Sequence, residues 1–166
     1  LFYNYEPAMG RNFAAEYTTS LREPSLEQLQ PVVDNSDPLN TYSGNPELQP
    51  EYAHNLELRL MRFDQFTMTS FFATLGATYV SDRITNASTV DSLFRRSIRP
   101  VNVAQDVTLN GYANFGRPFR FIKSNFNISL SSTYNRGILF VNEVKNNTDR
   151  WQHAINVSLD NRNKEK

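Results

Sequence analysis

Hydrophobic and polar residues alternate along most of this chain, segment after segment. Successive side chains of a β-strand point to opposite sides, so an alternation of period two predicts strands with one apolar and one polar face. It predicts about six strands, over residues 11–22, 54–63, 66–81, 107–115, 125–135 and 151–159. No amphipathic helix of useful length competes with them. The sequence therefore predicts an all-β fold.

The segment over residues 54–63 shows the pattern most clearly. Leu56, Leu58 and Leu60 would share one face, and Asn55, Glu57 and Arg59 would share the other. The polar positions of the other segments carry mostly Asn, Ser and Thr, where a soluble surface usually carries Lys and Glu. The predicted strands, at about 10 to 16 residues, also exceed the usual length of about 5 to 6. Both features favour a membrane barrel wall over a soluble β-sandwich, which alternates in the same way.

The connections between these segments differ in length. The links at 64–65 and 116–120 are short, whereas those at 23–51, 82–102 and 136–149 are long and polar. In an antiparallel up-and-down sheet this places the short turns at one end and the long loops at the other. Transmembrane β-barrels have this asymmetry, with short periplasmic turns and longer extracellular loops. We therefore expect a barrel segment with three long extracellular loops.

The first long loop holds five of the eight prolines. Proline fixes φ and removes a hydrogen-bond donor, so we expect these residues to stiffen the loop without letting it add strands to the sheet. Within it, residues 24–29 predict one helical turn, with Ser25 as N-cap and Gln28 completing a capping box. An ordinary surface loop is the alternative interpretation.

Aromatic residues gather near the predicted strand ends, where the interfacial girdles of a barrel would lie. They are Phe63, Phe66, Tyr79, Phe115, Phe119, Phe121, Tyr134 and Trp151. The core and rim of a soluble protein would also use such residues, and that alternative stays open.

Composition narrows the classes further. The 166 residues carry 17 Lys and Arg against 17 Asp and Glu, which gives no electrostatic argument for nucleic acid as a partner. The chain has no cysteine, which excludes disulfides and thiolate sites. It also lacks an apolar run of about 18 residues, which excludes an ordinary transmembrane helix.

Candidate chemistry is sparse. His54 and His153 lie inside predicted strands and belong to no catalytic or metal-ligand motif, so we expect no enzyme, no cofactor and no metal site. Asp34, Asn35, Asp37 and Glu47 form a loose acidic group, for which turn capping is favoured over cation binding. Of the N-x-S/T sequons at Asn86, Asn127, Asn146 and Asn156, those at Asn127 and Asn156 lie inside strands, where alternation produces the pattern by itself.

The ordered elements of residues 20–58, SLREPSLEQLQPVVDNSDPLNTYSGNPELQPEYAHNLEL, resemble the barrel part of the TonB-dependent receptor superfamily of Bacteroidota. There a strand ending in an Arg-x-Pro-like element opens a loop with "QL-P", "NPL" and "GNP-L-PE" segments. The matching residues are Arg22, Pro24, Gln28, Leu29, Pro31, Asn35, Pro38, Leu39, Gly44, Asn45, Pro46, Leu48, Pro50 and Glu51. Residues 99–103 and the strand rhythm extend the resemblance more loosely.

This resemblance implies a barrel of roughly 22 strands with a plugged lumen. Six strands cannot close even the smallest bacterial barrel of about 8. We therefore expect residues 1–166 to be part of one barrel domain in a longer chain, without the plug domain, and residues 161–166 to form a periplasmic turn.

The expected function is that of an outer-membrane receptor and transporter for TonB-dependent nutrient uptake in a Gram-negative bacterium. Its expected partners are outer-membrane lipid, the TonB energy-coupling system and a surface lipoprotein, with no nucleic acid. Two alternatives stay open: a non-transporting structural or assembly barrel that holds partner proteins, and a soluble β-sandwich binding module.

Overall fold

Strands make up most of the computed structural model, which describes residues 1–34 and 36–161. The strands are β1 (Phe2–Ala8), β2 (Arg11–Arg22), β3 (Val33–Asp34), β4 (Asn40–Ser43), β5 (Glu51–Asp64), β6 (Thr69–Val90), β7 (Arg96–Phe119), β8 (Ser124–Val141) and β9 (Val144–Asn161). The helices are α1 (Leu26–Leu29) and the single 3₁₀ turn η1 (Arg120–Ile122). The all-β expectation is confirmed.

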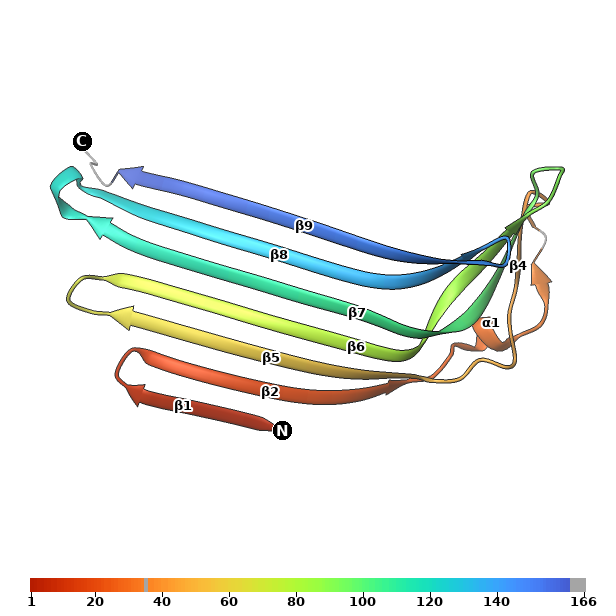
Figure 1. The fold of residues 1–166 in the computed structure, drawn as a ribbon, viewed down its shortest axis with the longest axis horizontal. Coiled ribbons are helices and arrows are strands. Elements are labelled where there is room, and N and C mark those ends of the chain that lie inside the picture. Colours follow the sequence, from red (N-terminus) through yellow and green to blue (C-terminus); the bar gives the residue numbers. More distant parts are fainter. Residues whose placement is uncertain (35, 162–166) are drawn as a thin grey trace.

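The seven long strands follow one another in an up-and-down sheet (Figure 1). Each of β1, β2, β5, β6, β7, β8 and β9 pairs antiparallel with the next. Short links join them at one end, over residues 9–10, 65–68 and 120–123, and we call this the short-turn end. The opposite end carries residues 23–50 and the tips of two hairpins, and we call it the loop end.

The strand register confirms the predicted faces. Tyr17 lies opposite Leu56, and Leu56 lies opposite Ala77. The same row continues through Leu109, Tyr134 and Trp151. Directly paired residues of a sheet point to the same side, so the predicted apolar positions all lie on one surface, the apolar face. The Asn, Ser and Thr positions between them form the polar face.

Two expectations about the strands were wrong. Within the described residues the sheet has nine strands instead of about six, because β1, β3 and β4 were missed. The first long loop also adds β3 and β4 in spite of its prolines, because Pro38 lies just before β4 and leaves the backbone of Asn40 to Ser43 free to pair. The long strands form an open sheet with β1 and β9 at its edges, as expected for a segment of a barrel.

The expected loops at 82–102 and 136–149 are mostly strand extensions. β6 and β7 stay paired as far as Val90 and Arg96, and β8 and β9 as far as Val141 and Val144. The extensions have no regular apolar alternation, because β-branched and polar residues can pair there with no lipid against one face. Of the three expected long loops, the one that follows β2 is the only one that the described residues keep as a loop. The predicted short links lie at 65–68 and 120–123, and Pro118 continues β7.

The hairpin of β6 and β7 turns over beyond Ser81. Its ladder skips Asp82, which has a positive φ of 52°. Below this point β6 lies between β5 and β7, whereas at the tip Ser88 of β6 pairs with Val141 of β8. At the tip β7 instead pairs with β4, in parallel, from Asn40 opposite Arg96. The two strands have therefore exchanged sides, as their crossing in Figure 1 shows.

The small protein core lies near this crossover. Leu48, Val80, Val103 and Ile138 are buried, and Pro100 has no accessible side chain. Large apolar side chains on the rest of the sheet, such as Leu130 and Ile155, are exposed. The described residues therefore form one sheet without the second layer that a β-sandwich needs. No helix within residues 1–34 and 36–161 is long and apolar enough to cross a membrane.

Candidate functional site

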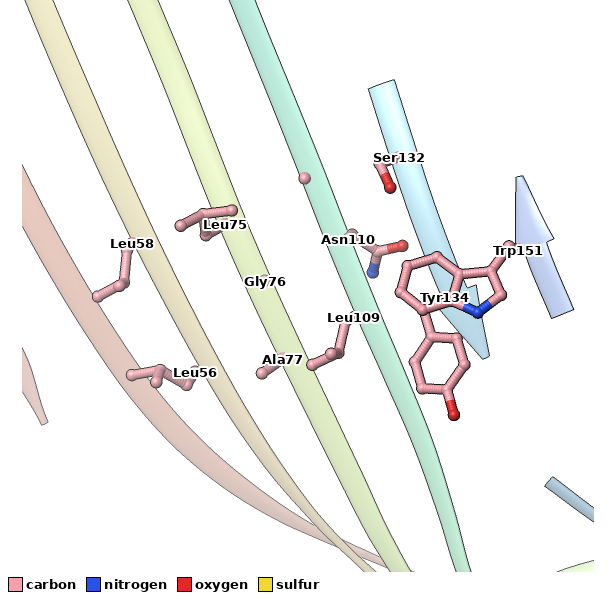
Figure 2. A pocket seen from close by; sticks show the side chains of 11 residues that line it. Leu56, Leu58, Leu75, Gly76, Ala77, Leu109, Asn110, Ser132, Tyr134 and Trp151 are labelled. Atoms are coloured by element: carbon pink, nitrogen blue, oxygen red, sulfur yellow. The ribbon is translucent and has the colours of Figure 1, made fainter. Parts of the chain in front are cut away.

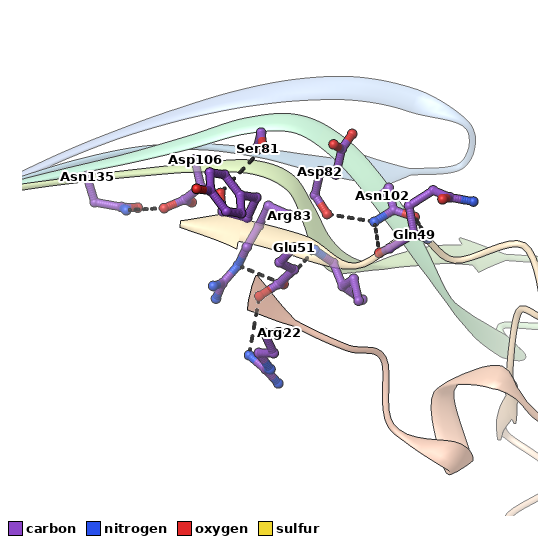
Figure 3. Close-up of polar contacts among 11 residues, drawn as sticks. Arg22, Gln49, Glu51, Ser81, Asp82, Arg83, Asn102, Asp106 and Asn135 are labelled. Atoms are coloured by element: carbon purple, nitrogen blue, oxygen red, sulfur yellow. Dashed lines mark hydrogen bonds and ion pairs between the residues drawn. The ribbon is translucent and has the colours of Figure 1, made fainter. Parts of the chain in front are cut away.

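The loop that follows β2 folds back onto the turned hairpin and forms a cluster of hydrogen bonds and ion pairs with it. We call this cluster the loop junction. It consists of Arg22, Asn45, Gln49, Glu51, Arg83, Arg99 and Asn102. Figure 3 shows its lower part, where the ends of β2 and β5 meet β6 and β7.

Local sequence shapes the loop before it reaches the junction. The predicted capping box is confirmed: the Ser25 hydroxyl accepts the N–H of Gln28, and the Gln28 side chain accepts the N–H of Ser25. Gly44 passes so close to α1 that a Cβ there would lie 2.2 Å from the carbonyl oxygen of Gln30. The N–H of Asn45 then donates to the carbonyl of Gln28. The loop is therefore folded around α1.

Asn45 joins the loop to β7 through its buried side chain. Its Nδ2 donates to the carbonyl of Pro100 at 3.1 Å. Its Oδ1 accepts from the Arg99 guanidinium at 3.0 Å and from the N–H of Glu47 at 3.1 Å. A buried amide that makes these contacts fixes both orientation and distance, because leaving any of them unmade would cost free energy.

Gln49 and Asn102 form a second contact between the loop and β7. The N–H of Gln49 donates to Asn102 Oδ1 at 2.8 Å, and Asn102 Nδ2 donates back to the Gln49 carbonyl at 2.9 Å. Asn102 Nδ2 also donates to the carbonyl of Asp82 at 2.6 Å, where the hairpin turns over. One side chain therefore holds the crossover and the loop together.

Glu51 carries the charge at the centre of the junction. It is only 4% exposed. Its Oε1 accepts the N–H of Ile84 at 2.7 Å and lies 3.7 Å from Nε of Arg83. Its Oε2 lies 3.6 Å from Nη1 of Arg22. Since a buried carboxylate needs such partners, this carboxylate ties the first residues of β5 to β2 and β6 (Figure 3).

The family-like motif residues divide into two groups. Arg22, Gln28, Gly44, Asn45 and Glu51 take part in the junction or in the turn that leads to it. The other described motif positions lie in the same loop, and Leu48 is the buried one among them: Pro24, Leu29, Pro31, Pro38, Leu39, Pro46, Leu48 and Pro50. Asn35 lies outside the described residues. The sequence interpretation missed Arg83, and it included Arg99, Pro100 and Asn102 only in the looser resemblance of residues 99–103.

The acidic group of the loop works in turns. The N–H of Ser36 donates to Asp34 and lowers the pKa of its carboxyl below the usual value. The Asn40 side chain and the N–H of Leu39 lower the pKa of Asp37 in the same way. Within residues 1–34 and 36–161 no three potential ligands are grouped as a metal ion requires. These carboxylates serve the backbone, as turn capping predicts.

The polar face below the junction is lined by amides and hydroxyls. Asn135 Nδ2 donates to Thr108 Oγ1 at 2.9 Å and to Asp106 Oδ1 at 3.3 Å. Further across the face, Thr78 donates to Asn55 at 2.9 Å. These groups pair with one another across neighbouring strands and still present a hydrated surface, which suits contact with water and not with hydrocarbon.

The apolar face carries an aromatic row toward its loop end. It contains Tyr17, Tyr52, Tyr79, Tyr134 and Trp151, with both histidines beside it: His54 is hydrogen-bonded to the Tyr17 hydroxyl at 2.6 Å, and His153 stacks on Trp151. A second row toward the short-turn end contains Phe13, Phe71, Phe115 and Phe126. Phe63, expected in a girdle, lies instead on the polar face opposite Ser70, and Phe66 lies in a turn.

The spacing of the two aromatic rows matches a membrane. From Phe71 to Tyr79 the strand rises about 26 Å, or about 20 Å along the membrane normal at a tilt of about 40°. The apolar band of outer-membrane barrels is about 25 Å tall. Beside the row toward the loop end, a shallow hollow of about 370 Å³ has leucines on one side and Tyr134 and Trp151 on the other (Figure 2). Its lining is almost wholly apolar, which suits hydrocarbon chains.

One comparison decides the family. Residues 1–165 match the outer membrane protein beta-barrel family. The chain belongs to this family. It is a protein of the outer membrane of a Gram-negative bacterium. No curated protein matches the chain. In that membrane the apolar face contacts lipid, because the other face carries amides and charges that hydrocarbon would leave unsolvated.

Proposed function

We propose that this outer membrane β-barrel protein is a receptor and transporter for TonB-dependent uptake of a nutrient. The observation that carries the proposal is the loop junction. Short turns of outer-membrane barrels face the periplasm and long loops face the medium, so the junction stands at the cell surface. It anchors residues 45–51 of the loop to β6 and β7 above the polar face, as a surface that captures a ligand requires.

The motif residues support the proposed superfamily. Arg22, Gly44, Asn45 and Glu51 were singled out by their resemblance to TonB-dependent receptors of Bacteroidota, and they are the residues that fix the loop. A loop held by buried side chains is pre-organised, which lowers the entropic cost of binding a ligand.

The proposal includes a larger barrel than the described sheet. In hydrocarbon every backbone N–H and C=O must be paired, and the outer edges of β1 and β9 are unpaired within the described residues. We propose that further strands of a longer polypeptide close the barrel, and that TonB and a surface lipoprotein are its partners. No catalytic role belongs to this proposal.

The test compares uptake in the native bacterium with and without the gene that encodes this chain. Radiolabelled glycans, peptides and chelated metals serve as the panel, each measured with TonB present and with TonB deleted. The proposal expects that loss of the gene and loss of TonB lower the uptake of the same nutrient class to the same background. Unchanged uptake of every class in the gene deletion would contradict it.

A matched pair of variants tests passage along the polar face. Ser131 lies on the polar face and Ser132 on the apolar face, and neither side chain makes a described hydrogen bond. Ser131→Trp narrows the passage, so we expect slower uptake of the nutrient. Ser132→Trp adds an aromatic group toward lipid and serves as the control. Equal uptake by the two variants would argue against passage along this face.

A structural barrel that holds partner proteins is the second candidate. It is favoured by the completeness of the loop junction, since no buried side-chain polar atom of the described residues lacks a partner. A junction of this kind can serve as a rigid docking platform without transport. Co-purification of a stable partner from membranes of the native bacterium, together with unchanged uptake in the gene deletion, would favour this candidate.

A further inference from the structure

Three arginines stand on the apolar face close to the short-turn end. Arg11 of β2 lies directly opposite Arg62 of β5. Arg117 of β7 lies on the same face, one step nearer the turns than Phe115, which shares a row with Arg62 through Phe71. All three side chains are exposed. They form a row across the sheet at the edge of the apolar band, and we call it the basic row.

The protein itself neutralises this row only in part. Like charges placed directly opposite each other on a sheet are destabilising. No side chain of the basic row makes a hydrogen bond or an ion pair within the described residues. Asp64 lies two residues beyond Arg62 on the same face and attracts it electrostatically, while its Oδ1 accepts the N–H groups of Phe66 and Thr67. Three arginines against one carboxylate leave two uncompensated positive charges.

The surface between the arginines is hollowed. One hollow of about 410 Å³ lies between Arg62 and Arg117, with Asp64, Thr69 and Phe71 in its lining. A second, of about 510 Å³, lies between Arg11 and Arg62 and is lined mainly by apolar side chains, among them Phe13 and Leu60. Arg62 lines both. In the first hollow the Thr69 hydroxyl accepts from Thr67 and keeps its own proton to donate.

We infer that the basic row binds the headgroup of an anionic phospholipid in the periplasmic leaflet. A guanidinium forms paired hydrogen bonds with phosphate oxygens. One phosphate between two opposed arginines binds to both guanidinium groups and offsets the repulsion between them. The hollows open onto the band of phenylalanines and leucines, where the acyl chains of the same molecule would lie. The surplus of two positive charges favours an anionic over a zwitterionic headgroup.

The test measures lipid binding by the intact polypeptide, extracted from the outer membrane into neutral detergent micelles. Native mass spectrometry counts phosphatidylglycerol and phosphatidylcholine molecules bound to the wild-type protein and to Arg62→Gln and Arg117→Gln. Arg136→Gln is the matched control, because Arg136 lies on the same face at the opposite end and is paired with Asp149. The readout does not depend on transport, so it separates this inference from the proposed function.

We expect the wild-type protein and the Arg136→Gln control to bind phosphatidylglycerol with the same affinity. The affinity of Arg62→Gln should be at least about tenfold lower. Arg117→Gln should lose only part of that affinity, because Arg117 lines one of the two hollows and Arg62 lines both. Four results would overturn the inference: equal losses in Arg62→Gln and Arg136→Gln, equal binding of both lipids, displacement of the lipid by millimolar inorganic phosphate, or a dimer that Arg62→Gln dissociates.

Discussion

Four arginines at the loop end of the sheet and three at its short-turn end differ in their partners. At the loop end Arg22, Arg83, Arg95 and Arg136 are all paired with carboxylates of the protein. At the short-turn end the three arginines of the basic row have no such partner among the described residues. The difference follows from the surroundings: the loop end stands in water and must hold itself together, whereas the short-turn end can use lipid headgroups as its counter-charges.

The same contrast applies to packing. The buried side chains, such as Leu48 and Val103, gather under the loop junction. Between the aromatic rows the apolar side chains have no protein on top of them, because hydrocarbon covers that face in the membrane. Within the described residues, the protein therefore has a buried protein core only where it leaves the bilayer. Substitutions should lower the folding stability mainly in that region.

The largest effect is expected at Gly44. Gly44→Ala puts a Cβ within 2.2 Å of the Gln30 carbonyl oxygen, so α1 or the loop must move, at a cost of about 3 kcal/mol. Hydrogen exchange of the amides in residues 26–48 measures this as faster opening. Gly76→Ala is the control, because its Cβ meets nothing closer than 3.9 Å on the polar face. Equal protection in the two variants would contradict the packing of α1 on the loop.

Glu51→Gln should have the next largest effect. The amide keeps one acceptor for the N–H of Ile84 but removes the charge that faces Arg22 and Arg83. Both arginines are partly exposed, so we expect a loss of about 2 kcal/mol in the opening free energy of the junction. Urea-dependent proteolysis of the loop measures it. Glu47→Gln, on the same loop, should leave the opening free energy nearly unchanged. A comparable loss in Glu47→Gln would contradict the specific role of Glu51 in the junction.

Arg62→Gln should act in the opposite direction to Glu51→Gln when anionic lipid is absent. Removing one of two directly opposed arginines relieves repulsion, so in neutral detergent we expect unchanged stability or a gain of about 0.2 to 1 kcal/mol. The urea midpoint of the intact protein gives the answer. A clear destabilisation would show that the protein itself neutralises this arginine.

The smallest effect concerns pH and Asp91. The N–H and the side chain of Arg95 donate to this carboxylate, and so does the N–H of Leu93. These hydrogen bonds lower the pKa of the carboxyl below its usual value of 3.8. Because the pKa of Asp91 is lower in the folded turn than in the unfolded chain, the charged carboxylate stabilises the fold at any pH above the unfolded-state pKa. This stabilisation is lost as the pH falls through the folded-state pKa. Proteolysis of residues 91–95 should therefore rise only below about pH 4. Asp91→Asn should flatten that rise.

Much of the fold could be predicted from the sequence. Lipid on one side of the sheet and water on the other require strict alternation of apolar and polar residues. The alternation alone therefore predicted correctly that Leu56, Leu58 and Leu60 share one face. The capping box of Ser25 and Gln28 is equally local and was predicted correctly. The prediction failed where this constraint ends. Residues 82–90 and 96–102 lack the alternation and were interpreted as part of a loop, although they belong to β6 and β7.

The loop junction could be predicted only by half. Asn45 and Glu51 were singled out by resemblance, but their partners come from far along the chain. Pro100 and Arg83 meet them only because the hairpin turns over at Asp82, and nothing local in the sequence announces that crossover. β1 was missed because Pro7 and the irregular pairing near Ala8 obscure its alternation.

The assignment of the two faces is the central claim, and spin-label accessibility tests it most directly. The chain has no cysteine, so single cysteines at successive positions 73–78 of β6 can each carry a nitroxide in the intact protein in membranes. We predict that positions 73, 75 and 77 are accessible to oxygen dissolved in lipid, and that 74, 76 and 78 are accessible to a water-soluble nickel complex. Equal accessibility of neighbouring positions to either reagent would contradict the account.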